Sequence, residues 1–211
     1  VGKETKYKTL DGRYVEKIKF DSMPEATKWV NEYKNVTNFE YFGNTRHQYP
    51  FIAEEFEGKI DWDMNQIKLL SIDIECESEN GFPSPEKADQ PLICITVKDH
   101  TSKKIIVFGM GNFVNDREDV QYINCSSETH LVETFTKFWV EYNPDIITGW
   151  NVKFFDIPYL MNRFRYLMGD DWLNQFSPWG VVEQRSATVL FASREQQVWN
   201  IMGVDTLDYL D

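Results

Sequence analysis

Downstream of about residue 66, hydrophobic and polar residues alternate in short runs bounded by turn-forming residues. A period of two is typical of β-strands whose two faces meet different surroundings. The polar link between the second and third runs is short, which favours antiparallel pairing of those two strands. The expected strands cover residues 67–76, 92–98 and 104–108.

The pattern changes to helical spacing further along the chain. Leu131, Phe135 and Phe138 recur three or four residues apart, which places them on one face of a helix over residues 127–142. Three strands followed by helix, strand and helix is the chain order of a ribonuclease H-like fold, an α/β class with a mixed sheet. The further elements expected here are a short strand over 146–148 and a helix over 155–168.

Residues 1–65 are more polar and are expected to form a small N-terminal α/β subdomain, which leaves residues 66–211 as the larger domain. An Asp-Gly pair at 11–12, between two short runs of aromatic and aliphatic residues, predicts a β-hairpin. A Ser-x-x-Glu capping box predicts a helix over 22–33. The stretch 44–58 is expected to be a connection that contains an aromatic and acidic run.

Two extended runs near the C-terminus, at 188–191 and 197–201, flank Ala192–Glu195 and predict a protruding hairpin. A further extended segment is expected over 204–210. The first residue is not Met, and the chain stops at Asp211 directly after that extended segment. We therefore expect a segment of a longer protein.

The composition excludes some classes of function. With 211 residues, of which 42% are hydrophobic, the chain can bury a sizeable core. Three widely spaced cysteines and three isolated histidines argue against a disulfide framework and against a thiolate or imidazole metal site. No apolar stretch approaches the length of a membrane span, so we expect no membrane partner.

Two carboxylates share one face of the first predicted strand. Side chains alternate along a strand, so Asp73 and Glu75 point to one face while Ile72 and Ile74 point to the other. Carboxylates two residues apart lie roughly 6–7 Å from each other and repel unless a cation lies between them. Mg²⁺ prefers oxygen ligands of this kind, although a solvated acidic strand face is the more ordinary explanation when the pair stands alone.

A third carboxylate, Asp156, falls where the short strand turns into the next helix. It can complete a metal site begun by Asp73 and Glu75, or it can interact only with the helix dipole. Asn151, just before it, can offer its amide to a substrate phosphate or sugar. Together these residues suit hydrolysis of a phosphodiester by a two-metal mechanism, with the ions roughly 3.5–4 Å apart.

These residues form two motifs that resemble the first two exonuclease motifs of the family B DNA polymerases. The motifs are Asp73-Ile74-Glu75 and Asn151-x-x-x-Phe155-Asp156. The wider sequence is similar to the replicative polymerases of T-even-like bacteriophages over nearly the whole chain. The segments that carry this resemblance are 73–85, 148–163, Ser193–Glu195 and 207–211.

The resemblance implies 3′→5′ proofreading of DNA, with Asp73, Glu75 and Asp156 as ligands of two Mg²⁺ or Mn²⁺ ions. It also implies that Asn151 contacts the terminal nucleotide and that Phe82, in a Gly-Phe-Pro loop, stacks on unpaired bases. The alternative for Phe82 is a loop aromatic that is folded into the core. The alternative for Arg194 is a solvated turn residue. The substrate-binding residues implied by the resemblance are Asn151, Phe82, Phe155 and Arg194.

The family has a third exonuclease motif, Tyr-x-x-x-Asp, which supplies an orienting tyrosine and a fourth carboxylate. Two local matches occur, at Tyr7–Asp11 and at Tyr166–Asp170. The first precedes both other motifs at the Asp-Gly turn, and the second lies roughly 15–21 Å along the helix from Asp156. We therefore expect the domain over 66–211 to lack its third motif and to be impaired as an exonuclease by itself.

The partners that the resemblance implies are the single-stranded 3′ end of a DNA primer, the rest of the polymerase chain, and a sliding clamp reached through other regions. It implies RNA binding for the N-terminal subdomain and action in the cytoplasm of the infected bacterial host. The basic residues near Tyr7 and Tyr14 suit a weak nucleic-acid strip, or simply a solvated hairpin face. Those basic residues are Lys3, Lys6, Lys8, Arg13, Lys17 and Lys19.

Two other functions remain open: a non-catalytic nucleic-acid or protein interaction module on the same fold, and a stand-alone exonuclease acting on RNA. The net charge of −12 argues at first sight against any nucleic acid, because phosphate binding depends on Lys and Arg. The acidic excess lies in residues 66–211, with 22 acids and 12 bases, whereas residues 1–65 carry 12 and 10. The charge therefore predicts weak, salt-sensitive DNA binding by this chain.

Overall fold

A computed structural model describes residues 7–43, 48–56, 58–59, 61–79, 81–189 and 194–210. The chain divides into two compact units, Val1–Trp62 and Asp63–Asp211. The sequence had placed the division at residue 65. Each unit is described by itself.

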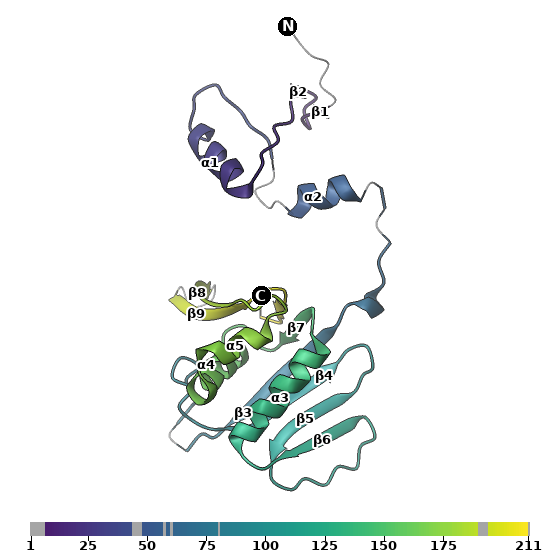
Figure 1. The fold of residues 1–211 in the computed structure, drawn as a ribbon, viewed down its shortest axis with the longest axis vertical. Helices are drawn as coiled ribbons and strands as arrows, with labels where there is room; N and C mark the ends of the chain where they lie inside the picture. Colours follow the sequence, from purple (N-terminus) through teal and green to yellow (C-terminus); the bar gives the residue numbers. More distant parts are fainter. Residues whose placement is uncertain are drawn as a thin grey trace. The chain divides into compact units, whose positions relative to one another are not determined.

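The first unit begins with a small hairpin, in which β1 (Tyr7–Lys8) pairs antiparallel with β2 (Tyr14–Val15) (Figure 1). Helix α1 (Met23–Tyr33) follows, and the hydroxyl of Ser22 accepts a hydrogen bond from the backbone N–H of Glu25 at 3.4 Å. Both the hairpin and the N-capped helix confirm the sequence prediction, although the strands are shorter than the runs that predicted them.

The stretch 44–58 is not only a connection, because it contains helix α2 (Gln48–Glu55). Pro50 obscured this helix in the sequence. It lies in the first turn, where its missing N–H has no intrahelical partner to lose and its fixed φ suits the helix. The prediction was therefore wrong for residues 48–55.

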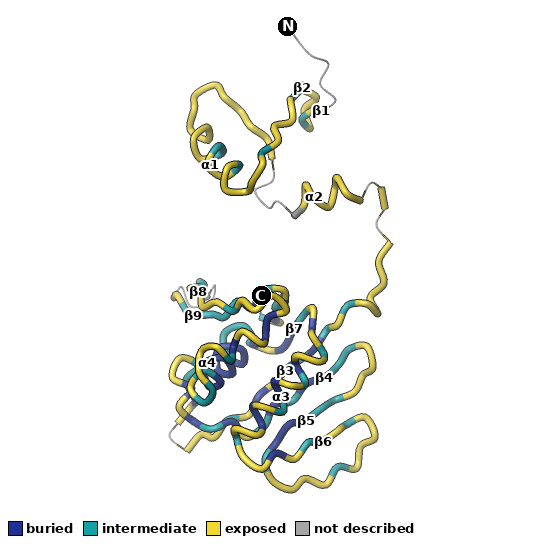
Figure 2. Tube along the Cα trace, in the orientation of Figure 1, coloured by how far each residue is buried: buried dark blue, intermediate teal, exposed yellow. Residues whose placement is uncertain are grey.

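Packing in the first unit is light. The ring of Trp29 stacks on Tyr33 with centroids 4.7 Å apart and lies edge-on to Phe39 and Tyr41. No residue of α1 is buried, and Figure 2 shows exposed positions along most of this unit.

The second unit is built on a six-stranded mixed sheet in the order β10-β7-β3-β4-β5-β6. Strand β3 pairs antiparallel with β4, which pairs antiparallel with β5, while β7 and β10 add parallel strands on the other side of β3. This arrangement confirms the predicted ribonuclease H-like α/β class. The strands are β3 (Leu69–Cys76), β4 (Leu92–Asp99), β5 (Ile105–Met110), β6 (Val120–Cys125), β7 (Ile146–Gly149) and β10 (Asp205–Asp208).

Helices α3 (Glu128–Tyr142) and α4 (Asp156–Met168) pack their apolar sides against the sheet (Figure 1). The buried positions, dark blue in Figure 2, gather there. Phe135, at the centre of α3, is fully buried and its ring contacts those of Phe108, Phe164 and Phe176. The remaining elements are α5 (Asp170–Leu173), 3₁₀ turns at Met64–Gln66 and Asn174–Phe176, and the antiparallel hairpin of β8 (Val182–Val189) and β9 (Arg194–Ile201).

The sequence did not predict β6, which lies at the edge of the sheet and pairs parallel with β5. Only Cys125 of this strand is buried, so the six residues lack the strict alternation that identified the other strands. Their place depends on hydrogen bonds to β5, a long-range cause that a local pattern does not contain.

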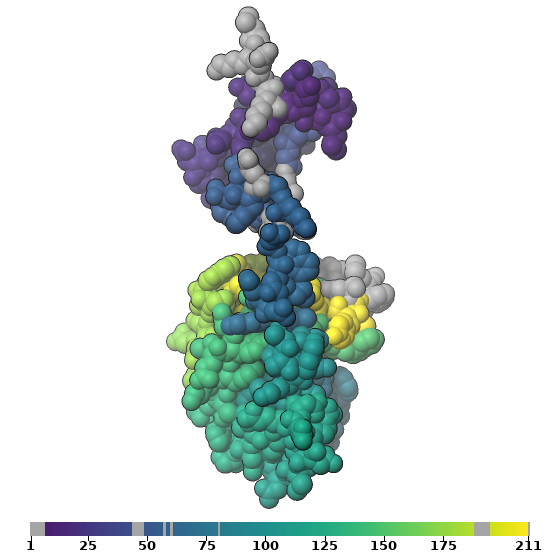
Figure 3. All heavy atoms as spheres, turned by 90° about the vertical axis from the view of Figure 1, so that its right-hand side faces the viewer, coloured from purple at the N-terminus to yellow at the C-terminus, as the bar shows by residue number. Residues whose placement is uncertain are grey.

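Among the described residues, no helix is both long and apolar enough to cross a bilayer. Cys76, Cys94 and Cys125 are all free thiols. On the face that Figure 3 shows, the teal and green atoms of the second unit form one continuous packed surface.

Candidate active site

Strand β3 presents two carboxylates on its polar face. Ile72 and Ile74 are buried on the side that faces the core, whereas Asp73 and Glu75 are exposed on the other side. Neither carboxylate makes a hydrogen bond or an ion pair with the described part of the chain. Their charges still act on the neighbouring strand. Burial is the largest cause that raises the pKa of the Cys94 thiol, and the negative charges of Glu75 and Asp73 raise it further. The strand face is therefore negative and its two acids are free to bind a cation.

The third carboxylate depends on a tight junction between β7 and α4. A Cβ added to Gly149 would lie 2.7 Å from the carbonyl oxygen of Ile72, so only glycine lets β7 end this close to β3. Asn151 then turns the chain with a left-handed φ of 56°, a conformation that Asn tolerates better than most residues. Helix α4 starts five residues later with Asp156 as its first residue.

Asp156 is 4% exposed and its Oδ1 accepts a hydrogen bond from the backbone N–H of Ile74 at 3.2 Å. This N–H is available because the pairing of β3 with β7 ends at Ser71. Burial, followed by repulsion from Asp73, raises the pKa of Asp156 to about 7. The two motifs thus meet here: an acid from the helix start lies against the strand that carries Asp73.

These residues fit a divalent cation by their chemistry, since the cluster offers carboxylate oxygens and a buried acid that has no basic partner among the described residues. In the described ranges, however, no group of three or more Asp, Glu, His or Cys side chains is arranged to hold a metal ion. The structure brings Asp73 close enough to Asp156 to raise its pKa. Glu75 is exposed on β3, the strand that also carries Asp73.

The described part of the chain leaves the side-chain amide of Asn151 without a hydrogen bond, and the residue is partly buried. Phe82 is 86% exposed, which excludes the alternative that it is folded into the core. Its ring lies 5.5 Å from that of Phe155, which in turn lies 6.0 Å from buried Tyr159. A row of aromatic rings thus leads from the surface to the helix that carries Asp156.

The hairpin prediction is confirmed, and both strands are longer than expected. Its tip, residues 190–193, lies outside the described residues, as does the side chain of Arg194; the backbone of Arg194 pairs with Val189. One side chain links this hairpin to the junction before α4: the amide of Gln196 donates to the carbonyl oxygen of Phe154 at 2.9 Å.

The sequence missed Asp208, which is 9% exposed at the end of β10. Its Oδ1 accepts the backbone N–H of Asn151 and its Oδ2 that of Lys153, each at 2.9 Å. The segment 207–211 had entered only through the family resemblance, and no local spacing links Asp208 to a residue 57 positions earlier. Asp211 lies outside the described residues.

Tyr166, one of the two sequence matches to a third motif, is 76% exposed near the C-terminal end of α4. Asp170 follows on α5. The helix thus carries Tyr166 away from Asp156.

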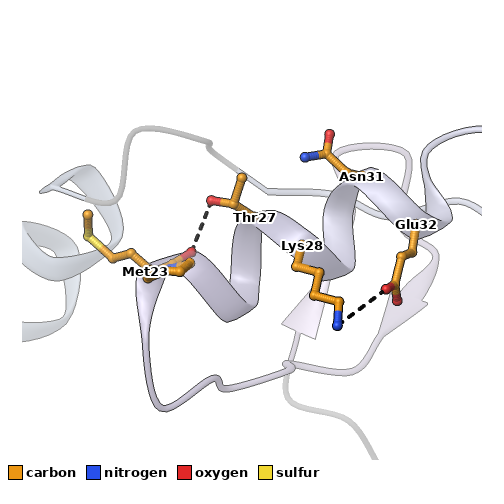
Figure 4. A pocket seen from close by; sticks show the side chains of 6 residues that line it. Met23, Thr27, Lys28, Asn31 and Glu32 are labelled. Carbon is orange, nitrogen blue, oxygen red and sulfur yellow. Dashed lines mark hydrogen bonds and ion pairs between the residues drawn. The ribbon is translucent and has the colours of Figure 1, made fainter.

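A separate hollow lies on the first unit along one flank of α1 (Figure 4). Lys28 and Glu32 form an ion pair of 4.0 Å there, and the Thr27 hydroxyl donates to the carbonyl oxygen of Met23. Its polar groups are paired along a single helix, so the hollow lacks the converging groups of a catalytic site.

The family described as DNA polymerase family B, exonuclease domain, matches residues 23–211. The chain is 27% identical over 99% of its length to the DNA-directed DNA polymerase of Enterobacteria phage T4, and 26% identical over 98% to that of Escherichia phage RB69. It covers 26% and 25% of those two proteins, so it spans about a quarter of the relatives that it matches. A solved family B DNA polymerase from Pyrobaculum calidifontis covers 68% of this chain and the chain 15% of it, at 24% identity and a TM-score of 0.44.

Proposed function

Because the chain belongs to DNA polymerase family B through its exonuclease domain, we propose that it is the proofreading part of a phage DNA-directed DNA polymerase. Its reaction is hydrolysis of the 3′-terminal phosphodiester of a DNA strand. One observation carries the proposal: the carboxylate of Asp156 lies against β3, where burial, followed by repulsion from Asp73, raises its pKa to about 7. A charge without a basic partner in such a place is typical of a site that binds a cation or handles a proton.

Asp73, Glu75 and Asp156 are the proposed ligands of Mg²⁺ or Mn²⁺, with two ions in the complete domain. When bound, such ions supply positive charge to the phosphodiester that is cleaved. The protein contributes the carboxylate oxygens and holds Asp156 through the Ile74 N–H. Cation binding also balances the charge that burial makes unfavourable at Asp156.

The proposed contacts with substrate come from Asn151, Phe82, Phe155 and Arg194. The side-chain amide of Asn151, which makes no hydrogen bond with the described part of the chain, would donate to the terminal nucleotide. Phe82 is exposed and would stack on an unpaired base, supported behind by Phe155. Arg194, at the start of β9, would contact the strand from the hairpin, which would keep primer and template apart.

We further propose that these 211 residues are impaired by themselves. The Tyr-x-x-x-Asp segment at 166–170 lies along and beyond α4, and its tyrosine is exposed. Without an orienting tyrosine and a fourth carboxylate, positioning of the attacking water is weakened, and losses of position alone can cost orders of magnitude.

The proposed setting is a polymerase in the cytoplasm of an infected bacterial host. Its partners are the single-stranded 3′ end of a primer, the rest of the polymerase chain and, through other regions, a sliding clamp. RNA is a proposed ligand of the first unit, where Lys8 lies 4.6 Å from the ring centre of Tyr14.

The test is degradation of a 5′-labelled single-stranded DNA, with Mg²⁺ or Mn²⁺ and with EDTA. We expect slow, metal-dependent shortening from the 3′ end, loss of activity in Asp73→Ala, and unchanged activity in the control Asp116→Ala, an exposed acid between β5 and β6. The same assay is run with a longer chain that carries a third motif, which should be faster. Cleavage in EDTA, or full activity of Asp73→Ala, would refute the assignment of a metal-dependent exonuclease site to these carboxylates.

The alternative is a non-catalytic module that binds nucleic acid or protein on the same fold. This second candidate function is supported by one observation: the described residues contain no preformed group of three metal ligands. Binding of the labelled strand without shortening by either chain would support the module, and faster shortening of an RNA of the same sequence would support an RNA exonuclease.

A further inference from the structure

The turn between β7 and α4 carries the Asn151 side chain that the proposed function places on substrate. Within the turn, the carbonyl oxygen of Asn151 accepts the N–H groups of Phe154 and Phe155, at 3.2 and 2.9 Å. Helix α4 begins without a side-chain N-cap, since Phe155 at that position makes no capping hydrogen bond. Asn151 has a left-handed φ of 56°, which non-glycine residues adopt only when surrounding contacts favour it. The local bonds engage the carbonyl oxygen of Asn151, whereas the N–H groups of Asn151 and Lys153 have a partner outside the turn.

That partner is the carboxylate of Asp208, which accepts both N–H groups. One oxygen accepts the N–H of Asn151 and the other the N–H of Lys153, each at 2.9 Å. The first oxygen also accepts the N–H of Leu210 at 2.9 Å, so the side chain bridges two segments. Hydrogen bonds to an ionised acceptor are stronger than those between neutral groups, and Asp208 is nearly buried.

Asp208 is itself fixed by the sheet. It pairs with Gly149 where the parallel strands β10 and β7 end. The Tyr209 N–H donates to the carbonyl oxygen of Gly149 at 3.1 Å, and the Thr148 hydroxyl donates to the carbonyl oxygen of Leu207 at 2.7 Å. A rigid strand end thus presents the carboxylate to the turn.

We propose that Asp208 is a positioning residue of this site, which sets the Asn151 amide and the start of α4 by clamping the backbone of residues 151–153. The role as positioning residue for DNA cleavage rests on the proposed function. The clamp itself does not, because it is a statement about the backbone of the turn.

The test compares Asp208→Asn with Asp205→Asn, a matched change at an exposed acid on the same strand. Among the described residues, the Asp205 carboxylate accepts a hydrogen bond only from the N–H of Thr206. Asn keeps one acceptor oxygen but puts an NH₂ group opposite a backbone N–H, so one hydrogen bond of the clamp is lost. Two measurements are made on each variant: amide hydrogen exchange along the chain, and binding of a ten-nucleotide oligothymidylate in EDTA, where no cleavage occurs.

We expect Asp208→Asn to raise exchange at Asn151 and Lys153 at least about tenfold while β3 to β5 stay protected, and Asp205→Asn to change neither. Affinity for the oligonucleotide should fall about tenfold in Asp208→Asn and in Asn151→Ala, with the double variant no weaker than the weaker single one. A merely structural role of Asp208 would instead give losses that multiply with those of Asn151→Ala.

Unchanged exchange at Asn151 and Lys153 in Asp208→Asn would overturn the clamp, and multiplying affinity losses would overturn its link to Asn151. If the unaltered chain does not bind the oligonucleotide in EDTA, and neither binds nor shortens it with added Mg²⁺, the proposed function fails. The exchange measurement still decides the clamp in that case, because it needs no DNA.

Discussion

Replacing Asp156 with Asn should stabilise the cation-free protein, and the gain should grow as the pH rises. Burial and repulsion by Asp73 raise the pKa of Asp156 from 3.8 to about 7 in the folded protein. A raised pKa means that the folded state binds the proton more tightly than the unfolded state. Its stabilising contribution is therefore complete below the unfolded pKa and is lost as the pH rises through the folded one.

The magnitude follows from the size of the shift. A shift of about three pKa units corresponds to roughly 4 kcal/mol, at about 1.4 kcal/mol for each unit, and this is an upper limit. Most of that loss falls between pH 5 and pH 8. Asn does not titrate, so the stability difference between Asp156→Asn and the unaltered protein should rise by roughly 2–3 kcal/mol across this interval.

The assay is urea unfolding in EDTA at pH 5 and pH 8, with Asp116→Asn as the control at an exposed acid. Comparing two pH values removes any constant cost of burying the new amide. At pH 8, added Mg²⁺ should stabilise the unaltered protein and not Asp156→Asn, since the proposed site loses a carboxylate ligand. The reasoning would be refuted if the stability difference between Asp156→Asn and the unaltered protein were the same at pH 5 and pH 8. Ionising the buried carboxylate would then not destabilise the folded protein.

Three further substitutions test other parts of the second unit. Gly149→Ala should destabilise by about 1–3 kcal/mol in urea unfolding, because the new Cβ would lie 2.7 Å from the carbonyl oxygen of Ile72; an unchanged midpoint contradicts this. Glu128→Gln should cost about 3 kcal/mol, since it breaks the nearly buried pair with Arg163; a loss below 1 kcal/mol would show that the pair is dispensable. Phe82→Ala should leave stability within about 0.5 kcal/mol but weaken oligothymidylate binding by roughly 1–3 kcal/mol; equal affinity argues against stacking.

Elements whose signals are local were predictable from the sequence. Ser127 caps α3 through the N–H of His130, and Asn143 ends the helix with a left-handed φ of 50°, so its bounds followed from its own residues. The alternation along β3 likewise predicted which side of the strand carries Asp73 and Glu75.

Elements that depend on distant residues were not predictable. Strand β6 exists because β5 offers it hydrogen bonds. Asp208 matters because β10 returns to the edge of β7 and brings a carboxylate to Asn151. No pattern within ten or fifteen residues of Asp208 contains that information. The sequence motif made Asp156 a candidate site residue, but its burial and its bond to Ile74 could be known only from the fold.

The acidity of the second unit determines how it would bind a strand. Residues 66–211 carry 22 acids and 12 bases, so their field repels phosphate at long range. At the proposed site, Asp73, Glu75 and buried Asp156 concentrate this charge where the phosphodiester would lie. Affinity must then come from bound cations, which reverse the local sign, and from stacking on Phe82, which is indifferent to it. The acids that oppose DNA binding in EDTA thus become the reason that Mg²⁺ should strengthen it.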